Sequence, residues 1–195
     1  MDWNLYQRIY DVSLHHHWVG TVFSDVEKVS IPLMVVMTAA LWFFSRPGGD
    51  RKWKLACGSA FASAALAYLV AFVIHHVWAR PRPYATHHIA HPWSNTTDAS
   101  FPSDHASVSY AIAFAVLAFD PIAGAIFIVV ATIIAVGRLF IGAHYPSDVV
   151  MGLVIGLLAA GVVVRLLPGF VSRVVSQVER VSDPLVRPLW RPKTR

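Results

Sequence analysis

Five long apolar stretches constrain this sequence more than any other feature. They cover residues 31–44, 55–78, 106–119, 122–141 and 149–167. A helix needs about 20 apolar residues to cross the hydrocarbon core of a membrane, and three of the stretches come close to or exceed that length. The first and third must extend into flanking residues to span. With 56% hydrophobic and 14% charged residues, and no amphipathic segments to cover such helices in a soluble protein, the sequence predicts an all-α integral membrane protein. We expect a bundle of five transmembrane helices.

The two ends of the chain differ in character from this core. Residues 1–28 do not read as a secretory signal, because polar residues such as Asp2, Arg8 and Asp11 interrupt any apolar run. Aromatic and aliphatic residues recur there at helical spacing, which predicts an amphipathic helix lying in the membrane interface. The expected organisation is therefore an interfacial N-terminal helix (1–28), a five-span domain (29–167) and a basic cytoplasmic tail (168–195). The single Cys57 excludes an intrachain disulfide framework.

Basic residues are concentrated in two regions. Of sixteen in the chain, four lie in the loop between the first two stretches and seven lie from residue 165 onward. With five spans these regions fall on one side of the membrane, and such a bias marks the cytoplasmic face. We therefore expect the loops at 79–104 and 142–147 to face the periplasmic or extracellular side of an inner (plasma) membrane. The net charge of +5 then indicates contact with anionic phospholipid headgroups, not with nucleic acid.

Three groups of polar residues lie at the outward ends of the predicted spans. They comprise His75, Arg80 and Arg82 after the second span, residues 100–105 before the third, and Arg138, His144 and Asp148 around the break between the fourth and fifth. Ionisable residues near span ends are costly unless they serve a function. The five-span topology brings all three groups to one membrane surface, and we expect the functional site there.

Phosphoryl transfer suits these side chains. Arginines bind phosphate in a bidentate manner that lysine cannot copy. If the third helix begins near Ser103, its free N–H groups also point at a bound anion. One histidine can attack phosphorus as a neutral imidazole while another protonates the leaving oxygen. A carboxylate behind the nucleophile fixes its tautomer, and the i, i+4 spacing of His144 and Asp148 allows that contact if the fifth helix begins early.

Three motifs carry a resemblance to a known family. Arg82-Pro83, Pro102-Ser-Asp-His105 and Arg138-x5-His144-x3-Asp148 resemble the signature motifs of the type 2 phosphatidic acid phosphatase (PAP2) superfamily. The resemblance covers about residues 55–167, and the third motif is highly specific. Within the superfamily, the run at 98–105, the short chain and the Pro-Arg-Pro context resemble bacitracin-resistance-type undecaprenyl diphosphatases.

This resemblance implies a role for each motif residue. His144 would be the nucleophile, Asp148 its orienting partner and His105 the general acid. Arg82, Ser103 and Arg138 would bind the substrate phosphate, and the resemblance implies no cofactor.

The sequence departs from the superfamily pattern at three positions. His75 stands where the first motif begins with lysine, and it remains a candidate donor to phosphate. Asp104 replaces the usual glycine of the second motif, a change that the undecaprenyl-diphosphatase group commonly shares. Gly137 replaces a serine that often precedes the third motif. Arg80, so close to Arg82, is a candidate for a second phosphate contact, and Asp104 is counted with the phosphate-binding candidates.

Other histidines have a simpler interpretation. His87, His88 and His91 lie in the long loop, but their spacing is irregular and no cysteine or glutamate accompanies them. Loop packing or substrate contact is therefore favoured over a zinc site, and we expect no metal. Gly152 and Gly156, an i, i+4 pair, allow close helix packing within one bundle or between chains, so the oligomeric state stays open.

The expected function is hydrolysis of a polyprenyl diphosphate to the monophosphate and phosphate through a phosphohistidine. An outward-facing site would recycle the lipid carrier of cell-wall synthesis. The alternatives are a phosphatase of phosphatidylglycerol phosphate, phosphatidic acid or a lipid A phosphate, and a lipid phosphotransferase. The least favoured alternative is a membrane protein that binds diphosphate without catalysis, because binding alone needs no nucleophile paired with a carboxylate.

Overall fold

The structure is a computed structural model that describes residues 2–190 except 88, 90–92 and 95. Helices account for most of the described chain, and no strand occurs in those residues. The elements are α1 (Asp2–His15), α2 (His17–Phe44), α3 (Lys52–Val77), α4 (Pro83–Thr86), α5 (Asp104–Leu117), α6 (Pro121–Phe140), α7 (Pro146–Leu166), α8 (Pro168–Val186) and a 3-10 turn η1 (Arg187–Trp190).

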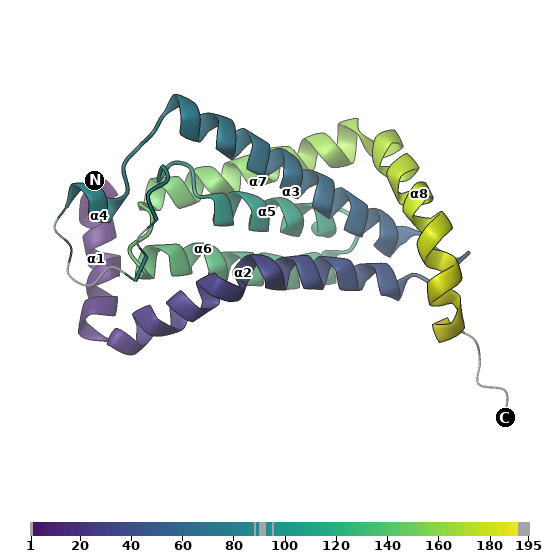
Figure 1. Cartoon of the computed structure of the whole chain (residues 1–195), viewed down its shortest axis with the longest axis horizontal. Coiled ribbons are helices and arrows are strands. Elements are labelled where there is room, and N and C mark those ends of the chain that lie inside the picture. The colour runs from purple at the N-terminus through teal and green to yellow at the C-terminus, as the bar shows by residue number, and fades with distance from the viewer. Residues whose placement is uncertain (1, 88, 90–92, 95, 191–195) are drawn as a thin grey trace.

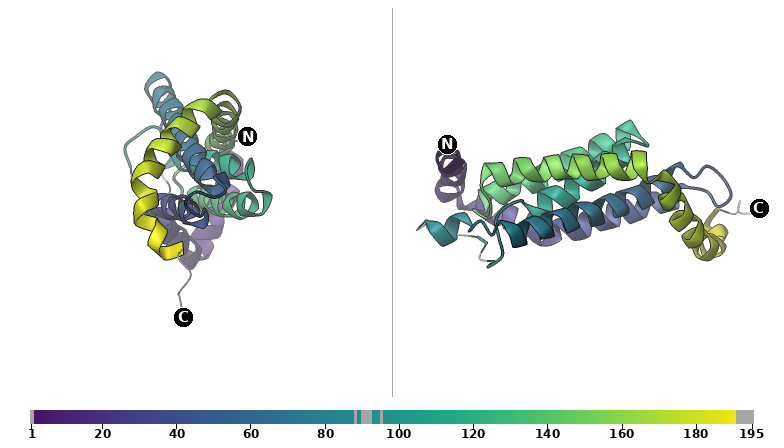
Figure 2. Two further views of the ribbon diagram at one scale, coloured as in Figure 1. Left: turned by 90° about the vertical axis from the view of Figure 1, so that its right-hand side faces the viewer. Right: turned by 90° about the horizontal axis from the view of Figure 1, so that it is seen from above.

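Helices α2, α3, α5, α6 and α7 run lengthwise and pack into the bundle (Figure 1). Helix α5 lies between α3, α6 and α7, and α2 packs against α3 and α6. Helices α1 and α8 lie across opposite ends of this bundle, as the turned views also show (Figure 2). We refer to these as the α1 end and the α8 end. The arrangement confirms the prediction of an all-α membrane bundle.

Four of the lengthwise helices are long and apolar enough to cross a membrane: α2, α3, α6 and α7. Helix α5 is apolar but has only 14 residues, which corresponds to about 21 Å. Alanines such as Ala106, Ala111 and Ala115 are fully buried along it, so its neighbours approach closely on all sides. A multi-pass membrane protein follows from these helices, while the count of five spans stays a prediction.

Local sequence signals set where the central helices begin. Asp120 accepts hydrogen bonds from the backbone N–H groups of Ile122 and Ala123 and so caps α6, whose first residue is a proline. Ser103 caps α5 by accepting from Ala106 N. Helix α7 also begins with proline, and this start places Asp148 in its first turn. Two of the three polar groups therefore stand at helix N-termini.

The N-terminal region differs from the expected single helix over 1–28. The chain turns at His16, and residues 17–28 continue into the first long apolar helix α2. Helix α1 is separate because its aromatic face packs on the end of the bundle: Tyr6 and Tyr10 are buried and Tyr6 contacts Tyr145. An amphipathic N-terminal helix thus exists, but it ends at His15, and its position in the membrane interface stays a prediction.

The expected basic tail is largely a docked helix. Val171 and Val175 of α8 are buried against the bundle. Lys54, at only 2% exposure, forms ion pairs with Asp183 at 2.6 Å and Glu179 at 3.4 Å on α8. Because a buried lysine is costly without anionic partners, these acidic residues hold α8 against the start of α3. The prediction missed this helix because it counted only the basic residues of the segment.

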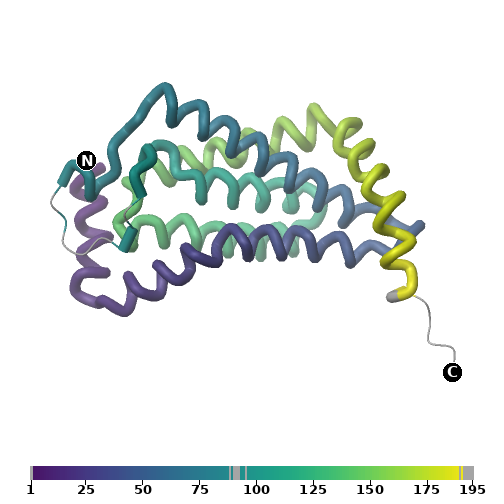
Figure 3. The backbone as a smooth tube through the Cα atoms, viewed as in Figure 1, coloured from purple at the N-terminus to yellow at the C-terminus, as the bar shows by residue number. Residues whose placement is uncertain are grey.

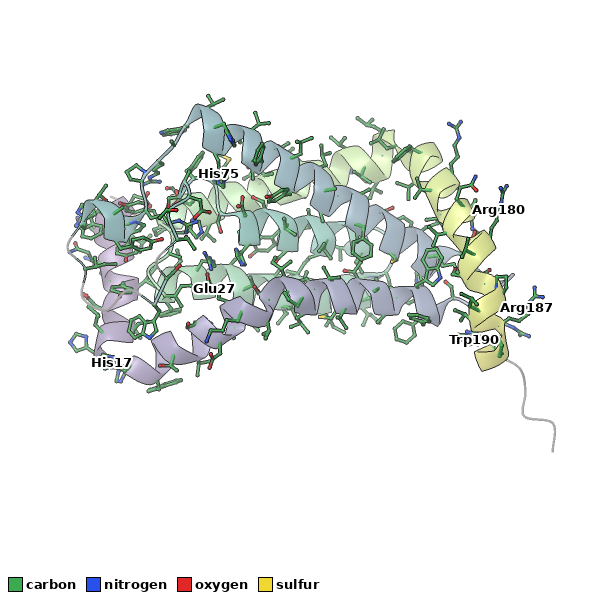
Figure 4. The ribbon with its side chains drawn as sticks, viewed as in Figure 1. His17, Glu27, His75, Arg180, Arg187 and Trp190 are labelled. Atoms are coloured by element: carbon green, nitrogen blue, oxygen red, sulfur yellow. The ribbon has the colours of Figure 1, made fainter. Side chains whose placement is uncertain are left out.

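The other faces of α8 are exposed. Phe170, Val181 and Leu185 leave apolar surface uncovered, and Arg180 and Arg187 point away from the bundle (Figure 4). A helix with this division of apolar and basic faces suits a membrane interface.

The glycine pair in α7 packs within the bundle. A Cβ atom on Gly152 would lie 2.7 Å from the Ala106 side chain, and one on Gly156 would lie 2.7 Å from the backbone nitrogen of Ala111. Both contacts are on α5, so these glycines allow α7 to approach α5. The alternative of packing between chains is not needed to explain them.

Candidate active site

The three polar groups meet at the α1 end of the bundle. The segment after α3, the turn before α5 and the connection between α6 and α7 converge there (Figure 3). Backbone hydrogen bonds tie them together: Ser100 N donates to Arg80 O at 2.8 Å, and Ser103 N donates to Asp148 O at 3.1 Å. The structure therefore brings together residues that are distant in sequence, such as Arg80 and Asp148, which are 68 positions apart.

His144 lies at the centre of this cluster with 1% of its surface exposed. Its Nδ1 is 2.7 Å from the carbonyl oxygen of Ser100. A carbonyl can only accept, so Nδ1 carries the proton and Nε2 keeps a free lone pair. Burial, reinforced by the positive charges of Arg138 and Arg82, holds the pKa of His144 well below its usual value. The ring is therefore neutral at physiological pH, as a nucleophilic imidazole must be.

Two arginines face the free nitrogen of this ring. Arg82 Nη1 lies 3.2 Å from His144 Nε2, and Arg138 Nη2 lies 3.4 Å from the same atom. Both side chains are almost fully buried, at 5% and 3% exposure. An oxyanion bound to these two guanidinium groups would bring its central atom close to Nε2. This is the geometry that in-line attack on a phosphoryl group requires.

Asp148 is linked to His144 through Ser100. Its Oδ2 lies 3.7 Å from His144 Nδ1, beyond hydrogen-bond distance, so the expected direct bond is absent. The carboxylate instead accepts from Ser100 Oγ at 2.5 Å and from Tyr145 N at 2.9 Å. The Ser100 carbonyl then holds the His144 ring. The Ser100 carbonyl occupies the position behind the ring, where the spacing predicts Asp148, and Asp148 in turn holds Ser100.

Arg80 contacts Asp148, whereas the arginines that contact His144 Nε2 are Arg82 and Arg138. One of its terminal nitrogens donates to Asp148 Oδ1 at 2.6 Å and to Ser147 Oγ at 2.8 Å. The other donates to Asp2 at 2.7 Å, and the guanidinium lies over the Tyr145 ring at 3.9 Å. With its donors used in this way, Arg80 stabilises the α7 turn, and its expected contact with a second phosphate stays a prediction.

The N-terminus of α5 supplies the remaining polar groups. Ser103 caps the helix, as expected from the motif, and the next residues begin its first turn. His105 lies in this first turn, and its charge interacts with those of Arg82 and His144. None of the hydrogen bonds among the described residues involves its ring. This freedom suits a proton donor to a leaving group.

His75 and Asp104 are neighbours at the edge of the site. His75 Nε2 is 2.9 Å from the carbonyl oxygen of Pro102 and 3.6 Å from Asp104 Oδ1. The carbonyl accepts a hydrogen bond from the Nε2–H group, so His75 supports the turn before α5. Asp104 Oδ1 has no hydrogen-bond partner within the described part of the chain. Both residues line a cavity of about 380 Å³ that also includes Asp98 and Ala99.

Asp98 separates this cavity from a second one of about 480 Å³, which includes Arg82 and Tyr84. Its carboxylate is 3.0 Å from Arg82 Nη2, and its backbone carbonyl accepts from Arg82 Nε at 3.1 Å. Although burial opposes it, hydrogen bonds and the charge of Arg82 lower the pKa of Asp98. Asp98 is therefore ionised and holds Arg82 from the side opposite His144.

Sequence reasoning missed two acidic residues at the site. Asp2 of α1 binds Arg80 and also accepts from Ser147 N at 3.1 Å. Glu27 of α2 forms an ion pair with Arg138. Both lie in the segment that was interpreted as an interfacial helix, where acidic residues are expected to face water. In the sequence, the one indication of a role for these residues is a carboxylate within an otherwise apolar or amphipathic helix. That pattern does not indicate which residue pairs with the carboxylate.

No group of three or more histidine, cysteine, aspartate or glutamate side chains is arranged for a metal ion within the described residues. His87 stacks on Trp3, with ring centroids 3.6 Å apart, which agrees with a packing role. His88 and His91 lie outside the described residues.

Comparison with known proteins supports these observations. The profile of the PAP2 superfamily matches residues 56–171. The undecaprenyl-diphosphatase BcrC of Bacillus subtilis (strain 168) is 27% identical over 191 residues, which cover 96% of this chain and 96% of that protein. The putative undecaprenyl-diphosphatase YbjG of Escherichia coli (strain K12) is 27% identical over 142 residues, covering 72% of this chain and 70% of that protein.

Solved structures share the fold. LpxE of Aquifex aeolicus has a TM-score of 0.66 at 20% identity, covering 84% of this chain and 94% of that one. The PAP2-type phosphatidylglycerolphosphate phosphatase of Bacillus subtilis has a TM-score of 0.59 at 21% identity, covering 83% of each chain. At these identities the likeness concerns the fold alone.

Proposed function

The chain belongs to the PAP2 superfamily, and from that premise we propose that it hydrolyses a polyprenyl diphosphate of the undecaprenyl type to the monophosphate and phosphate. Two relatives bear the name undecaprenyl-diphosphatase, one of them as putative, and the other aligns over 96% of this chain. The observation that carries the proposal is the His144 ring. Its Nδ1–H is held by a carbonyl while its free Nε2 faces two buried arginines.

The first step is transfer of the terminal phosphoryl group to His144. The Nε2 lone pair attacks the terminal phosphorus, and the bond from that phosphorus to the bridging oxygen breaks. Protonated His105 gives its proton to the departing oxygen of the lipid monophosphate. Arg82, Arg138 and the N–H groups at the start of α5 stabilise the charge on the phosphoryl oxygens. Asp148 positions His144 through Ser100.

The second step releases phosphate and restores the site. His105, now neutral, takes a proton from a water molecule as that water attacks the phosphorus of the phosphohistidine. The bond between Nε2 and phosphorus breaks, inorganic phosphate leaves, and His105 is again protonated. If the site faces outward, this reaction would regenerate the monophosphate carrier of cell-wall synthesis.

The substrate is tested by a side-by-side assay. Purified protein in detergent is given undecaprenyl diphosphate, phosphatidylglycerol phosphate or phosphatidic acid at equal concentration, with and without a chelator, and released phosphate is measured. We expect the highest kcat/KM for the diphosphate, and the same order with the chelator. A higher value for either of the other lipids would assign the site to that lipid. Absence of release from all three would contradict the proposed function.

The orientation of the site is a separate part of the proposal, based on the basic loop between α2 and α3 and the arginines of α8. Reporter fusions after Gly48 and after Ala79 test it, because these positions lie at opposite ends of α3. We expect a cytoplasmic signal from the first fusion and an external signal from the second. The reverse result would place the site on the cytoplasmic face.

A further inference from the structure

We propose that Glu27 of α2 is a positioning residue that aligns Arg138 with the phosphoryl group during catalysis. This inference rests on the proposed function, because it assigns Arg138 to the substrate. The contact is an ion pair between Arg138 Nη1 and Glu27 Oε1. The two residues are 111 positions apart and come from different helices. In Figure 4, Glu27 lies between α2 and α6.

The burial of Arg138 creates the need for such a partner. Its side chain is 3% exposed, and Glu27 is 21% exposed. A guanidinium in this setting loses its hydration, and an ion pair with hydrogen-bonding geometry offsets part of that loss. Glu27 is the only carboxylate within ion-pair distance of Arg138 among the described residues. The Arg138 Nε atom has no partner there, so the side chain is held mainly through Nη1.

Packing places Glu27 at the right level of the bundle. Phe23, one helical turn before Glu27, stacks on Phe140 with ring centroids 5.0 Å apart and planes 5° apart. A Cβ atom on Gly137 would lie 2.7 Å from the Phe23 ring. Gly137 therefore lets α2 approach α6 beside Arg138.

The planar guanidinium group transmits this contact to the nucleophile. Its terminal nitrogens are fixed relative to each other, so holding Nη1 against Glu27 also sets the direction of Nη2. Arg138 Nη2 lies 3.4 Å from His144 Nε2, where the phosphoryl oxygens must bind. Without Glu27 the guanidinium would keep its charge but lose this alignment.

Helix α2 lies outside residues 56–171, the part that matches the superfamily profile. The family core therefore supplies the nucleophile and the arginines, while the preceding helix supplies the group that aligns one of them. Because Glu27 belongs to α2, the alignment of Arg138 depends on the packing of α2 against α6.

The test is a set of Glu27 variants assayed with the lipid on which the wild-type protein is most active. We expect E27A to lower kcat by about 10- to 100-fold with a smaller change in KM, the scale of effect that misplaced catalytic groups produce. E27Q keeps the hydrogen bond and should retain more activity than E27A. The matched control is D25N, because Asp25 is exposed on the same helix and its ion pair among the described residues is with Lys28; its kcat should equal that of wild type.

A double-mutant cycle separates positioning from a general structural role. If Glu27 acts through Arg138, E27A should lower kcat by no more than about twofold in an R138A background. Thermal unfolding midpoints of all variants are measured in the same detergent. Additive losses in the cycle, or a loss in E27A matched by partial unfolding, would overturn the proposal. A lower KM in E27A would also overturn it, because Glu27 would then be a competitor of the phosphate. Inactivity of the wild-type protein would instead refute the proposed function.

Discussion

Replacement of His144 by alanine is expected to lower phosphate release by about 10⁴- to 10⁶-fold, the range found when a catalytic nucleophile is removed. The fold should survive, because the ring bonds only to a backbone carbonyl and to two arginines, and each arginine keeps a carboxylate partner without it. The measurement is phosphate release by purified protein with the preferred lipid. His15→Ala is the control, since His15 is an exposed residue at the end of α1 and should leave the rate unchanged.

A second measurement on the same variant tests the covalent intermediate. Wild-type protein incubated briefly with substrate labelled in its terminal phosphoryl group and quenched in alkali should retain label as a phosphohistidine. H144A should retain none. If H144A keeps either the label or a substantial rate, another residue is the nucleophile.

Arg82 is the position of the second large effect. We expect R82A to lower kcat/KM by about 10²- to 10³-fold, because it removes a donor aimed at the transferred phosphoryl group. R82K should recover little of this loss. A lysine has one compact ammonium group, whereas Arg82 contacts His144 and Ala143 O (3.0 Å) through Nη1 and the Asp98 carboxylate through Nη2. Steady-state kinetics on the preferred lipid measure both variants.

The control for Arg82 is Arg46→Lys, an exposed arginine in the loop between α2 and α3, which should behave as wild type. Activity of R82K near that of wild type would mean that Arg82 contributes only positive charge. The bidentate recognition argued from its geometry would then be wrong.

Much of the fold and the centre of the site could be predicted from sequence because apolar length and motif spacing report on them directly. The apolar runs located α3, α6 and α7 closely, and Ser103 indicated where α5 begins. Convergence of the three polar groups followed from topology alone. Residues at the same end of a helix or in the same loop are brought together by helix geometry, and the apolar pattern of a sequence predicts where its helices lie.

The sequence could not predict which residues of distant segments contact each other. The direct bond from Asp148 to His144 was a reasonable expectation from their spacing, but the Ser100 carbonyl, 44 residues away, occupies that position. Likewise Asp2 pairs with Arg80 in the segment after α3, and Glu27 pairs with Arg138 of α6. Acidic residues on an amphipathic segment look the same in sequence whether they face water or a buried cation.

The short central helix has a consequence for the depth of the reaction. At the α8 end, α5 is followed directly by Asp120, which pairs with Lys52 at the start of α3. From Asp120 towards the α1 end, the 14 residues of α5 extend only about 21 Å, whereas α3 is longer, with 26 residues. The site at the N-terminus of α5 therefore lies closer to the middle of the bundle than the end of a helix as long as α3 would. If the substrate is the proposed lipid diphosphate, its phosphate groups would reach this level while its chain stays in the bilayer, and substrate delivery would be diffusion in two dimensions.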